Sequence, residues 1–285
     1  MTQQARSKAV LITGCSTGIG RATAVRLAAK GHGVYATARR VEEIADLADR
    51  GCRTLALDVT DEASMTAAVE AVVRAEGAVG VLVNNAGYSQ SGALESLAID
   101  DVRRQFETNV FGPLRMCQLA LPGMRDQRWG RIVNVSSMGA NFVFPGGGSY
   151  HATKYAVDAM SDALRFEVKG FGVDVAIVQP GLIRTEFAQT AAAEASGPAG
   201  GPYASFNASV AQSTRDGYEK GPLARLGGGP EAAAKAIERA ITSDTPKIRY
   251  RVTPSARLLI RLRWLMTDGL WDRMLARQFT RPGVE

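Results

Sequence analysis

Short apolar runs alternate with alanine-rich stretches of helical length along most of the 285-residue chain. Two of these runs, VGVLV at 79–83 and VDVAIVQ at 173–179, are apolar almost throughout rather than at every second residue. Strands of this kind are covered by helices on both faces, as in parallel sheets. The alternation therefore predicts one α/β domain over residues 1–285, with a doubly wound parallel sheet of about seven strands flanked by helices.

The apolar runs and the helical stretches have definite expected positions. Strands are expected at 9–13, 34–37, 54–57, 79–83, 131–136, 173–179 and 248–252, and helices near 18–30, 42–50, 61–75, 99–127, 150–170 and 230–242. Residues 188–229 break this order because they are rich in alanine, glycine, serine and proline. A connection of that length is usually a functional lid or a disordered segment. Because it follows a late strand, where open α/β sheets bind ligands, we expect a substrate lid over 186–229.

Several classes of protein are disfavoured by the composition. The first residues lead into a strand without the apolar region of a signal peptide, and no stretch is long enough to cross a bilayer. The three cysteines, Cys15, Cys52 and Cys117, lie far apart, which argues against a disulfide framework or a zinc site. The chain has only two histidines. We therefore expect a cytoplasmic protein without a metal site.

The net charge of +6 is concentrated at the C-terminal end, where nine Lys/Arg and three Asp/Glu follow from Lys247 onward. A nucleic-acid binder usually carries a basic face on its folded body, so no nucleic-acid partner is expected. The extension 254–285 has leucines 258, 262 and 265 at helical spacing among arginines and two tryptophans. Such a basic amphipathic helix either packs over the substrate cleft or a partner subunit, which is the simpler expectation, or lies on an anionic membrane surface.

A glycine-rich turn, TGCSTGIG at 13–20, follows the first expected strand and precedes a helix. Glycine allows a sharp turn and a close approach of the backbone to a pyrophosphate, and the helix N-terminus offers unpaired N–H groups to the phosphates. The spacing G-x-x-x-G-x-G differs from the common G-x-G-x-x-G, so this turn alone is weak evidence. With the predicted sheet it indicates a Rossmann-type dinucleotide-binding fold.

The second expected strand ends in Ala38-Arg39-Arg40, and no acidic residue follows until Glu42. An acidic residue near this point would bind the ribose 2′-hydroxyl of NAD. Guanidinium groups instead form charge-assisted contacts with phosphate. We therefore expect Arg39, assisted by Arg40 or Ser16, to bind the 2′-phosphate of NADP, with NAD less favoured as the cofactor.

Tyr150 and Lys154 are four residues apart at the start of an expected helix, so both side chains can point into one cleft. A nearby ammonium favours the phenolate and lowers the tyrosine pKa, so that Tyr150 can exchange a proton with an alcohol or ketone oxygen. Ser137 precedes Tyr150 by thirteen residues and could stabilise a developing oxyanion, with Ser136 as the alternative. His151 is expected to be a neighbour rather than an acid–base residue.

These motifs together resemble the non-extended short-chain dehydrogenase/reductase family over roughly residues 8–186, and the hydroxysteroid/retinol-dehydrogenase-like branch more loosely. The resemblance adds the family's adenine-side Asp58, its Asn-Asn-Ala-Gly motif at 84–87 and its structural Asn109. It implies the catalytic tetrad Asn109, Ser137, Tyr150 and Lys154, with a relay water held by Asn109. The cofactor-binding residues that we expect are Gly14, Ser16, Thr17, Gly18, Ile19, Gly20, Arg39, Arg40, Asp58, Val59, Asn85, Ala86, Gly87, Tyr150, Lys154, Pro180, Gly181, Ile183 and Thr185.

The resemblance implies an NADP(H)-dependent oxidoreductase, a carbonyl reductase or secondary-alcohol dehydrogenase acting on a small apolar ketone or alcohol. It also implies a homodimer or homotetramer built on the helices around 101–127 and 150–170, binding of the nicotinamide ribose by Lys154, and use of the pro-S hydride. Two alternatives stay open: a non-catalytic NADP-sensing module, and reduction of another C=X bond such as an imine.

Further apolar residues, most of them aromatic, are candidates for an apolar substrate wall, although core or lid packing would explain each of them as well. These residues are Tyr88, Phe142, Val143, Phe144, Pro145, Phe187, Tyr203 and Phe206. Cys15 lies inside the glycine turn and could sense oxidants, although a small turn residue is the simpler interpretation.

Overall fold

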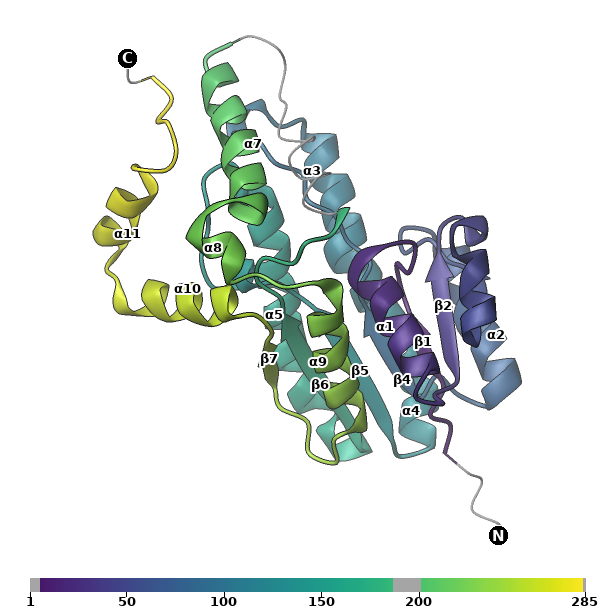
Figure 1. Cartoon of the computed structure of the whole chain (residues 1–285). Helices are drawn as coiled ribbons and strands as arrows, with labels where there is room; N and C mark the ends of the chain where they lie inside the picture. Colours follow the sequence, from purple (N-terminus) through teal and green to yellow (C-terminus); the bar gives the residue numbers. More distant parts are fainter. Residues whose placement is uncertain (1–5, 187–200, 284–285) are drawn as a thin grey trace.

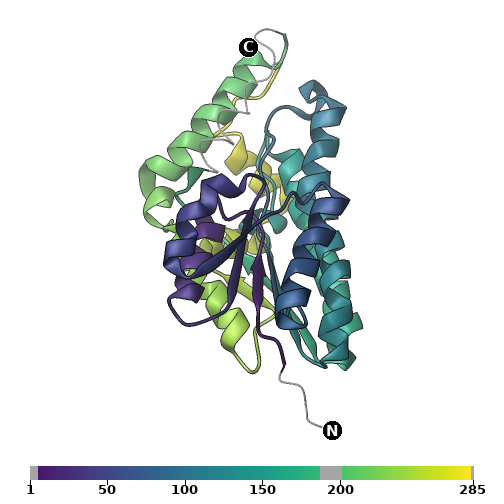
Figure 2. The same cartoon turned by 90° about the vertical axis from the view of Figure 1, so that its right-hand side faces the viewer.

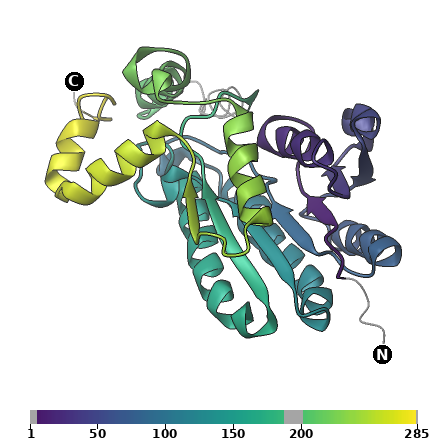
Figure 3. The same cartoon turned by 60° about the horizontal axis from the view of Figure 1, so that its bottom comes forward.

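A computed structural model describes residues 6–186 and 201–283 of the chain. All seven strands pair in parallel in the order β3-β2-β1-β4-β5-β6-β7, which confirms the predicted doubly wound sheet. The strand order reverses between β1 and β4, and the sheet and its helices are seen from three directions in Figures 1, 2 and 3. This reversal opens a crevice at the carboxyl ends of the strands, where such folds bind their ligands.

The elements lie close to their expected positions. The strands are β1 Val10–Ile12, β2 Val34–Ala38, β3 Cys52–Ala56, β4 Val81–Asn84, β5 Gly130–Val135, β6 Val173–Gln179 and β7 Arg249–Arg251. The α-helices are α1 Gly18–Ala28, α2 Glu62–Glu76, α3 Ile99–Phe106, α4 Gly112–Asp126, α5 Gly148–Val168, α7 Ala204–Glu219, α8 Gly221–Arg225, α9 Pro230–Thr242, α10 Pro254–Leu265 and α11 Asp268–Leu275. A 3-10 helix, Val41–Arg50, joins β2 to β3.

The sheet separates two apolar cores, which explains why its strands are apolar on both faces. In β1, Val10 and Ile12 pack toward α1 and α9, in the core that contains Leu27 and Ile237. Leu11 points the other way, into the core formed with α2 and α4. Figure 1 shows α1 and α9 on the near side of the sheet and α4 and α5 behind it. Alternate residues of one strand are therefore buried in different layers.

Three expected elements differ in detail. The helix expected over 99–127 contains a π-helical turn, Glu107–Phe111, which separates α3 from α4. The helical pattern over 255–278 is two helices, because Met266 and Thr267 are extended and Thr267 begins α11. The region 201–225, expected to be an irregular connection, contains α7 and α8.

Candidate active site

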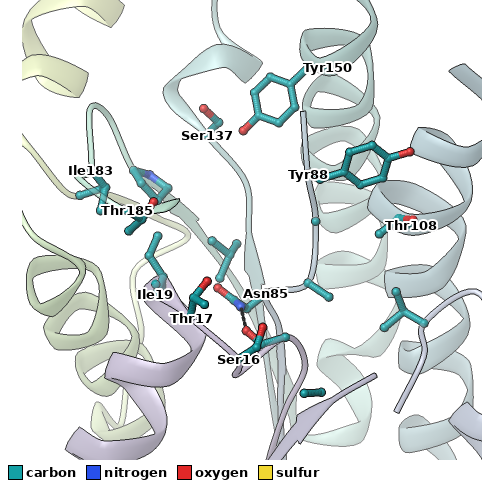
Figure 4. Close-up of a pocket in the computed structure, with 18 of the residues that line it drawn as sticks. Ser16, Thr17, Ile19, Asn85, Tyr88, Thr108, Ser137, Tyr150, Ile183 and Thr185 are labelled. Carbon is teal, nitrogen blue, oxygen red and sulfur yellow. Dashed lines mark hydrogen bonds between the residues drawn. The ribbon is translucent and has the colours of Figure 1, made fainter. Parts of the chain in front are cut away.

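The glycine turn after β1 is packed too closely for side chains. Gly14 has φ +71°, and a Cβ atom there would lie 2.9 Å from the Cα of Ala86. A Cβ on Gly20 would lie 2.2 Å from the carbonyl oxygen of Gly14. The Asn85 amide donates to the carbonyl oxygens of Thr13 and Gly14, both at 2.9 Å, and so ties the turn to the end of β4. Figure 4 shows Asn85 beside the turn residue Thr17 and above Ser16.

The start of α1 is suited to an anion. Thr17 is the extended residue before the helix and makes no side-chain capping bond, and the first turn contains no acidic residue. The first N–H groups of an α-helix lack intrahelical partners and carry the positive end of its dipole. A backbone cradle without Cβ atoms, followed by this helix terminus, fits the pyrophosphate of a dinucleotide.

A cleft of about 600 Å³ runs from this turn across the carboxyl ends of the strands. It brings together most of the expected cofactor residues: Gly14, Ser16, Thr17, Gly18, Ile19, Arg39, Asp58, Val59, Asn85, Ala86, Gly87, Tyr150, Lys154, Pro180, Gly181, Ile183 and Thr185. Gly20 and Arg40 are not among its lining residues. Gly20 instead lies against the turn, where a Cβ atom would clash with the carbonyl oxygen of Gly14.

The two arginines after β2 differ in position. Arg39 lines the cleft together with Ser16. The Arg40 side chain is 77% exposed and forms an ion pair with Glu43. The expectation that Arg40 could assist Arg39 is thus not supported by the geometry, because its guanidinium is held by a neighbouring carboxylate. Ser16 is the better placed of the two expected assistants.

The expected Asp58 has a local structural role as well as a place in the cleft. Its carboxylate accepts hydrogen bonds from the Thr60 backbone N–H at 2.9 Å and from the Thr60 hydroxyl at 2.8 Å. An aspartate side chain that bonds the backbone two residues later stabilises a turn, and these bonds do so after β3. The side chain that borders the cleft is therefore held in one orientation.

Tyr150 in α5 points its hydroxyl toward Ser137, which follows β5 (Figure 4). Burial raises the pKa of Tyr150 above its ordinary value, while the hydrogen bond with Ser137 lowers it. Burial is the larger effect, so Tyr150 is a protonated phenol near neutral pH. In this state the Tyr150 hydroxyl can donate a proton.

The Lys154 ammonium hydrogen-bonds the backbone of β5 and lies near the ring of Tyr150. It donates to the Val135 carbonyl oxygen at 3.0 Å and lies 5.7 Å from the centroid of the Tyr150 ring. Burial lowers the pKa of Lys154 to about 8, and the nearby Asp158 opposes that shift. Burial and the Ser137 hydrogen bond are the two largest influences on the Tyr150 pKa in this structure, and the expected lowering by Lys154 stays a prediction.

The two candidate serines face different environments. The Ser137 hydroxyl accepts from the Gly139 backbone N–H at 3.0 Å and borders both the cleft and a second cavity. The buried Ser136 hydroxyl lies 3.5 Å from the Lys154 carbonyl oxygen and hydrogen-bonds Asp158. Ser137 is therefore the serine placed to contact a substrate beside Tyr150.

Asn109 lies in the π-helical turn and is 1% exposed. Its side chain accepts from the Tyr88 N–H at 3.1 Å and donates to the Tyr88 carbonyl at 2.8 Å and the Thr153 hydroxyl at 3.1 Å. These bonds connect the segment after β4 to α5. The two amide N–H groups of Asn109 are both used and its oxygen accepts one bond, so the relay water expected at Asn109 stays a prediction.

His151 braces the segment between Ser137 and Tyr150. Its Nδ1 lies 2.8 Å from the Gly139 carbonyl oxygen, and its Nε2 accepts from the Phe144 N–H at 3.2 Å. This pattern requires a neutral ring with the proton on Nδ1. Burial lowers the pKa of His151, consistent with a neutral structural side chain rather than an acid–base residue.

A second, mainly apolar cavity of about 410 Å³ adjoins the cleft. Both cavities are lined by Ser137, Tyr150, Gly181 and Tyr218. Helix α7, which lies within the expected lid segment, supplies one wall of this cavity, including Val210 and Tyr218. The C-terminal extension supplies Leu259 and Phe279. A molecule in this cavity would lie next to the Tyr150–Ser137 pair.

The expected apolar wall is only partly formed by the residues that we named. Phe142, Phe144 and Pro145 line the second cavity. Tyr88 lines the cleft instead, and Val143 is 43% exposed. Tyr203 and Phe206 pack in a separate cluster under α7. Phe187 lies outside the described residues.

Two residues of the site were not found by sequence analysis. Tyr218 borders both cavities, and its charge would raise the Tyr150 pKa. No motif surrounds it, since it lies in the Ala/Gly/Ser-rich region. Asp158, one helical turn after Lys154, is buried and accepts from the Gln179 amide at 2.8 Å. The i, i+4 spacing from Lys154 was the one available indication of Asp158.

Cys15 is completely buried, and burial raises its pKa to about 12, which favours the turn-residue interpretation over oxidant sensing. Across residues 6–186 and 201–283, no group of three or more His, Cys, Asp or Glu side chains is arranged to hold a metal ion. Within the same residues, none of the helices has both the length and the apolarity needed to cross a membrane.

Comparisons with known proteins agree with this geometry. Residues 8–196 match the family model for short chain dehydrogenases. The chain is 43% identical over 178 residues to a 3-ketodihydrosphingosine reductase of Bacteroides thetaiotaomicron, covering 62% of this chain and 65% of that one. It is 31% identical over 275 residues to an NADPH-dependent 3-dehydrocapnine reductase of Ornithobacterium rhinotracheale, covering 93% and 94%.

A crystal structure of a short-chain dehydrogenase from Streptomyces avermitilis superposes with a TM-score of 0.75 at 34% identity, covering 95% of both chains. The family match covers well over half of the chain and contains the glycine turn, Ser137, Tyr150 and Lys154. The chain therefore belongs to the short-chain dehydrogenase/reductase family of oxidoreductases.

Proposed function

We propose that this protein is an NADPH-dependent carbonyl reductase that also oxidises the matching secondary alcohol. The observation that carries the proposal is the position of the Tyr150 and Ser137 hydroxyls, which border both the polar cleft and the apolar cavity. A carbonyl held in the apolar cavity would point its oxygen at these hydroxyls. Its carbon would face the cleft that fits the dinucleotide.

In the proposed carbonyl reduction each of three side chains has one role. NADPH supplies a hydride to the carbonyl carbon when it is bound. Tyr150 gives its phenolic proton to the carbonyl oxygen, so that the product is a neutral alcohol. Ser137 donates a hydrogen bond to the same oxygen and stabilises the negative charge that develops there. Lys154 then helps to stabilise the phenolate that Tyr150 leaves behind.

Arg39 and Ser16 support NADPH as the preferred cofactor. Arg39 borders the cleft at the end of β2, where a 2′-phosphate would bind if the pyrophosphate lies at the glycine turn. Its guanidinium suits a phosphate in geometry and charge. The matching relative from O. rhinotracheale is described as NADPH-dependent, which agrees with this assignment.

A ketone with a substantial apolar part is the substrate class that fits the second cavity. Its lining includes Met138, Phe142, Val210, Leu223 and Leu259. Two relatives are described as reductases, one of them for a keto compound. The high pKa of Tyr150 also favours reduction near neutral pH, because the proton donor is already in place.

The test is the loss of NADPH absorbance against a panel of aliphatic, aryl, steroid and retinoid carbonyls, with NADH in parallel. Turnover of ketones by NADPH, faster for apolar ones, is the expected result. In Arg39→Ser the KM for NADPH should rise at least about tenfold while that for NADH changes little, because a charged contact to the 2′-phosphate is lost. Turnover of imines alone would replace the carbonyl assignment. Binding of NADPH by folded protein that turns over no member of the panel would favour a sensing module.

A further inference from the structure

The C-terminal helix α10 has two apolar faces. Ala256, Leu259 and Ile260 are buried in a cluster with Phe142 and Leu182. On the opposite side Leu258, Leu262 and Leu265 form a stripe at i, i+4 and i+7, with 40%, 37% and 72% of their surfaces exposed. The leucines that indicated an amphipathic helix in the sequence thus keep more than a third of their surface exposed, and Leu265 keeps most of it.

Trp264 and two arginines complete this outer face, which we call the α10 outer face (residues 257, 258, 261, 262, 264 and 265). Trp264 is 84% exposed, the same fraction as Phe166 on α5. Arg257 and Arg261 precede Trp264 at i, i+4 and i+7 and form a basic stripe beside the leucines, all of them exposed. Helix α10 contains no acidic residue.

The charge around this face is strongly positive. Residues 254–283 contain six arginines and two aspartates, a net charge of +4. One of the two aspartates, Asp268, is paired with Arg263. The helices α10 and α11 project from the β7 side of the molecule (Figures 1 and 3).

An anionic lipid surface matches these features better than a second copy of the chain. A tryptophan and leucines beside arginines are the composition of helices that lie in the plane of a membrane interface. In a symmetric dimer the same patch faces itself, so the arginines of both copies would enter one interface to which α10 brings no acidic partner. Anionic headgroups would instead neutralise them.

We propose that the α10 outer face docks the protein on anionic lipid surfaces. The leucines and Trp264 would enter the headgroup region while Arg257 and Arg261 contact the headgroups. The same extension lines the apolar cavity through Leu259 and Phe279. Docking would therefore bring the cavity close to apolar molecules dissolved in the lipid, a consequence that rests on the proposed function.

The test is flotation of the full chain with vesicles of phosphatidylcholine containing phosphatidylglycerol, compared with phosphatidylcholine alone. The expected result is binding to the anionic vesicles that weakens as salt is added, because the Debye length shrinks. The double variant Trp264→Ser/Leu265→Ser should bind at least about tenfold more weakly, since most of the inserted apolar surface is lost. The control Ile99→Ser removes a 60% exposed apolar side chain on α3 and should bind like wild type.

The contribution of the two arginines to vesicle binding is tested with two double variants of equal net charge. Arg257→Gln/Arg261→Gln should weaken binding about fivefold for each arginine. Arg50→Gln/Arg74→Gln carries the same net charge, with both changes at the β3 end of the sheet, and should retain binding. Equal loss in the two charge variants would show attraction by net charge alone and would overturn the proposal.

Absence of flotation on anionic vesicles, or flotation unchanged in the Trp264→Ser/Leu265→Ser variant, would also overturn it. If light scattering shows a dimer that this variant dissociates, and no vesicle binding occurs, the face belongs to a second copy. NADPH affinity and turnover of a water-soluble ketone should stay at wild-type level in the variant. Failure of the proposed function would abolish turnover in every variant and leave the flotation result intact.

Discussion

At the scale of single residues, burial shifts Tyr150 and Lys154 toward their neutral forms. Burial raises the Tyr150 pKa and lowers that of Lys154 to about 8. Near neutral pH the pair is therefore a phenol beside an amine that is still mostly protonated. A developing negative charge on Tyr150 during proton transfer would favour the protonated lysine further.

His151 gives a residue-scale prediction about pH. Its pKa in the folded protein is lowered from the ordinary 6.5 by burial, so the folded state favours the neutral ring. Below pH 6.5 the unfolded chain binds a proton that the folded protein resists. The free energy of unfolding should thus be highest above that pH and fall by on the order of 1 kcal/mol as the pH decreases toward 5.

Urea unfolding at several pH values measures this effect. His151→Gln should remove most of the decrease, and His32→Gln should keep it, because His32 lacks the two backbone bonds that hold His151. The His151 variant should also lower kcat, since the segment from Gly139 to Phe144 then loses its brace beside Ser137. An unchanged pH response in His151→Gln would contradict this account.

At the scale of elements, a buried hydrogen bond and an apolar cluster attach α7 to the body within the described residues. The Asn207 side chain accepts from the Ala93 N–H at 2.9 Å, and Phe206 and Val210 pack beside it. Asn207→Ala should cost about 1–3 kcal/mol of stability, because a buried N–H loses its acceptor. It should raise the KM for an apolar ketone and leave the NADPH dissociation constant unchanged, because α7 covers the apolar cavity.

Steady-state kinetics and NADPH titration separate these two effects. Gln212→Ala is the matched control on α7, since Gln212 is exposed and pairs within the helix. It should change neither constant. An increase in the NADPH dissociation constant as large as that in KM would show that α7 supports the cleft rather than the apolar cavity.

The elements show which parts of the structure the sequence could predict. Strands such as 173–179 were found within a residue or two because burial on both faces leaves a continuous apolar run. The buried stripe of α7, from Phe206 to Ala211, was hidden because small residues surround it. The π-helical turn at Asn109 was missed because it is one extra residue within a helical pattern.

The residues of the site also fall into those that the sequence could predict and those that it could not. Motif residues with fixed spacing, such as Gly14, Tyr150 and Lys154, were placed in the cleft as expected. Tyr218 came from an element without a motif, and only packing brings it to Tyr150. The ion pair of Arg40 with Glu43 and the direction of the Lys154 ammonium depend on rotamers and local partners. Spacing alone does not determine these.

At the scale of the whole molecule, one tryptophan connects the C-terminal extension to the segment after β5. Trp271 is 4% exposed, its ring lies 5.5 Å from Phe142 and stacks on Phe144 at 6.2 Å, and its Nε1 lies 3.5 Å from the Val143 carbonyl. Trp271→Ala should cost about 3–5 kcal/mol of stability, because a large buried side chain leaves a cavity.

Thermal unfolding of Trp271→Ala and Trp264→Ala compares two tryptophans of the same extension. Trp264 is 84% exposed, and its replacement should change stability by less than about 0.5 kcal/mol. The Trp271 variant should also raise the KM for apolar ketones, since Leu259 and Phe279 then lose part of their support. Equal effects of the two substitutions would contradict the packing described here.

The most direct test of the central claim compares the wild type with Tyr150→Phe. The quantities measured are kcat with the best ketone of the panel and the dissociation constant for NADPH. The account predicts that kcat falls by about 10²- to 10⁴-fold, because the proton donor is removed, while NADPH binding changes little. Retention of most of the turnover by folded Tyr150→Phe protein would contradict it and would exclude Tyr150 as the proton donor.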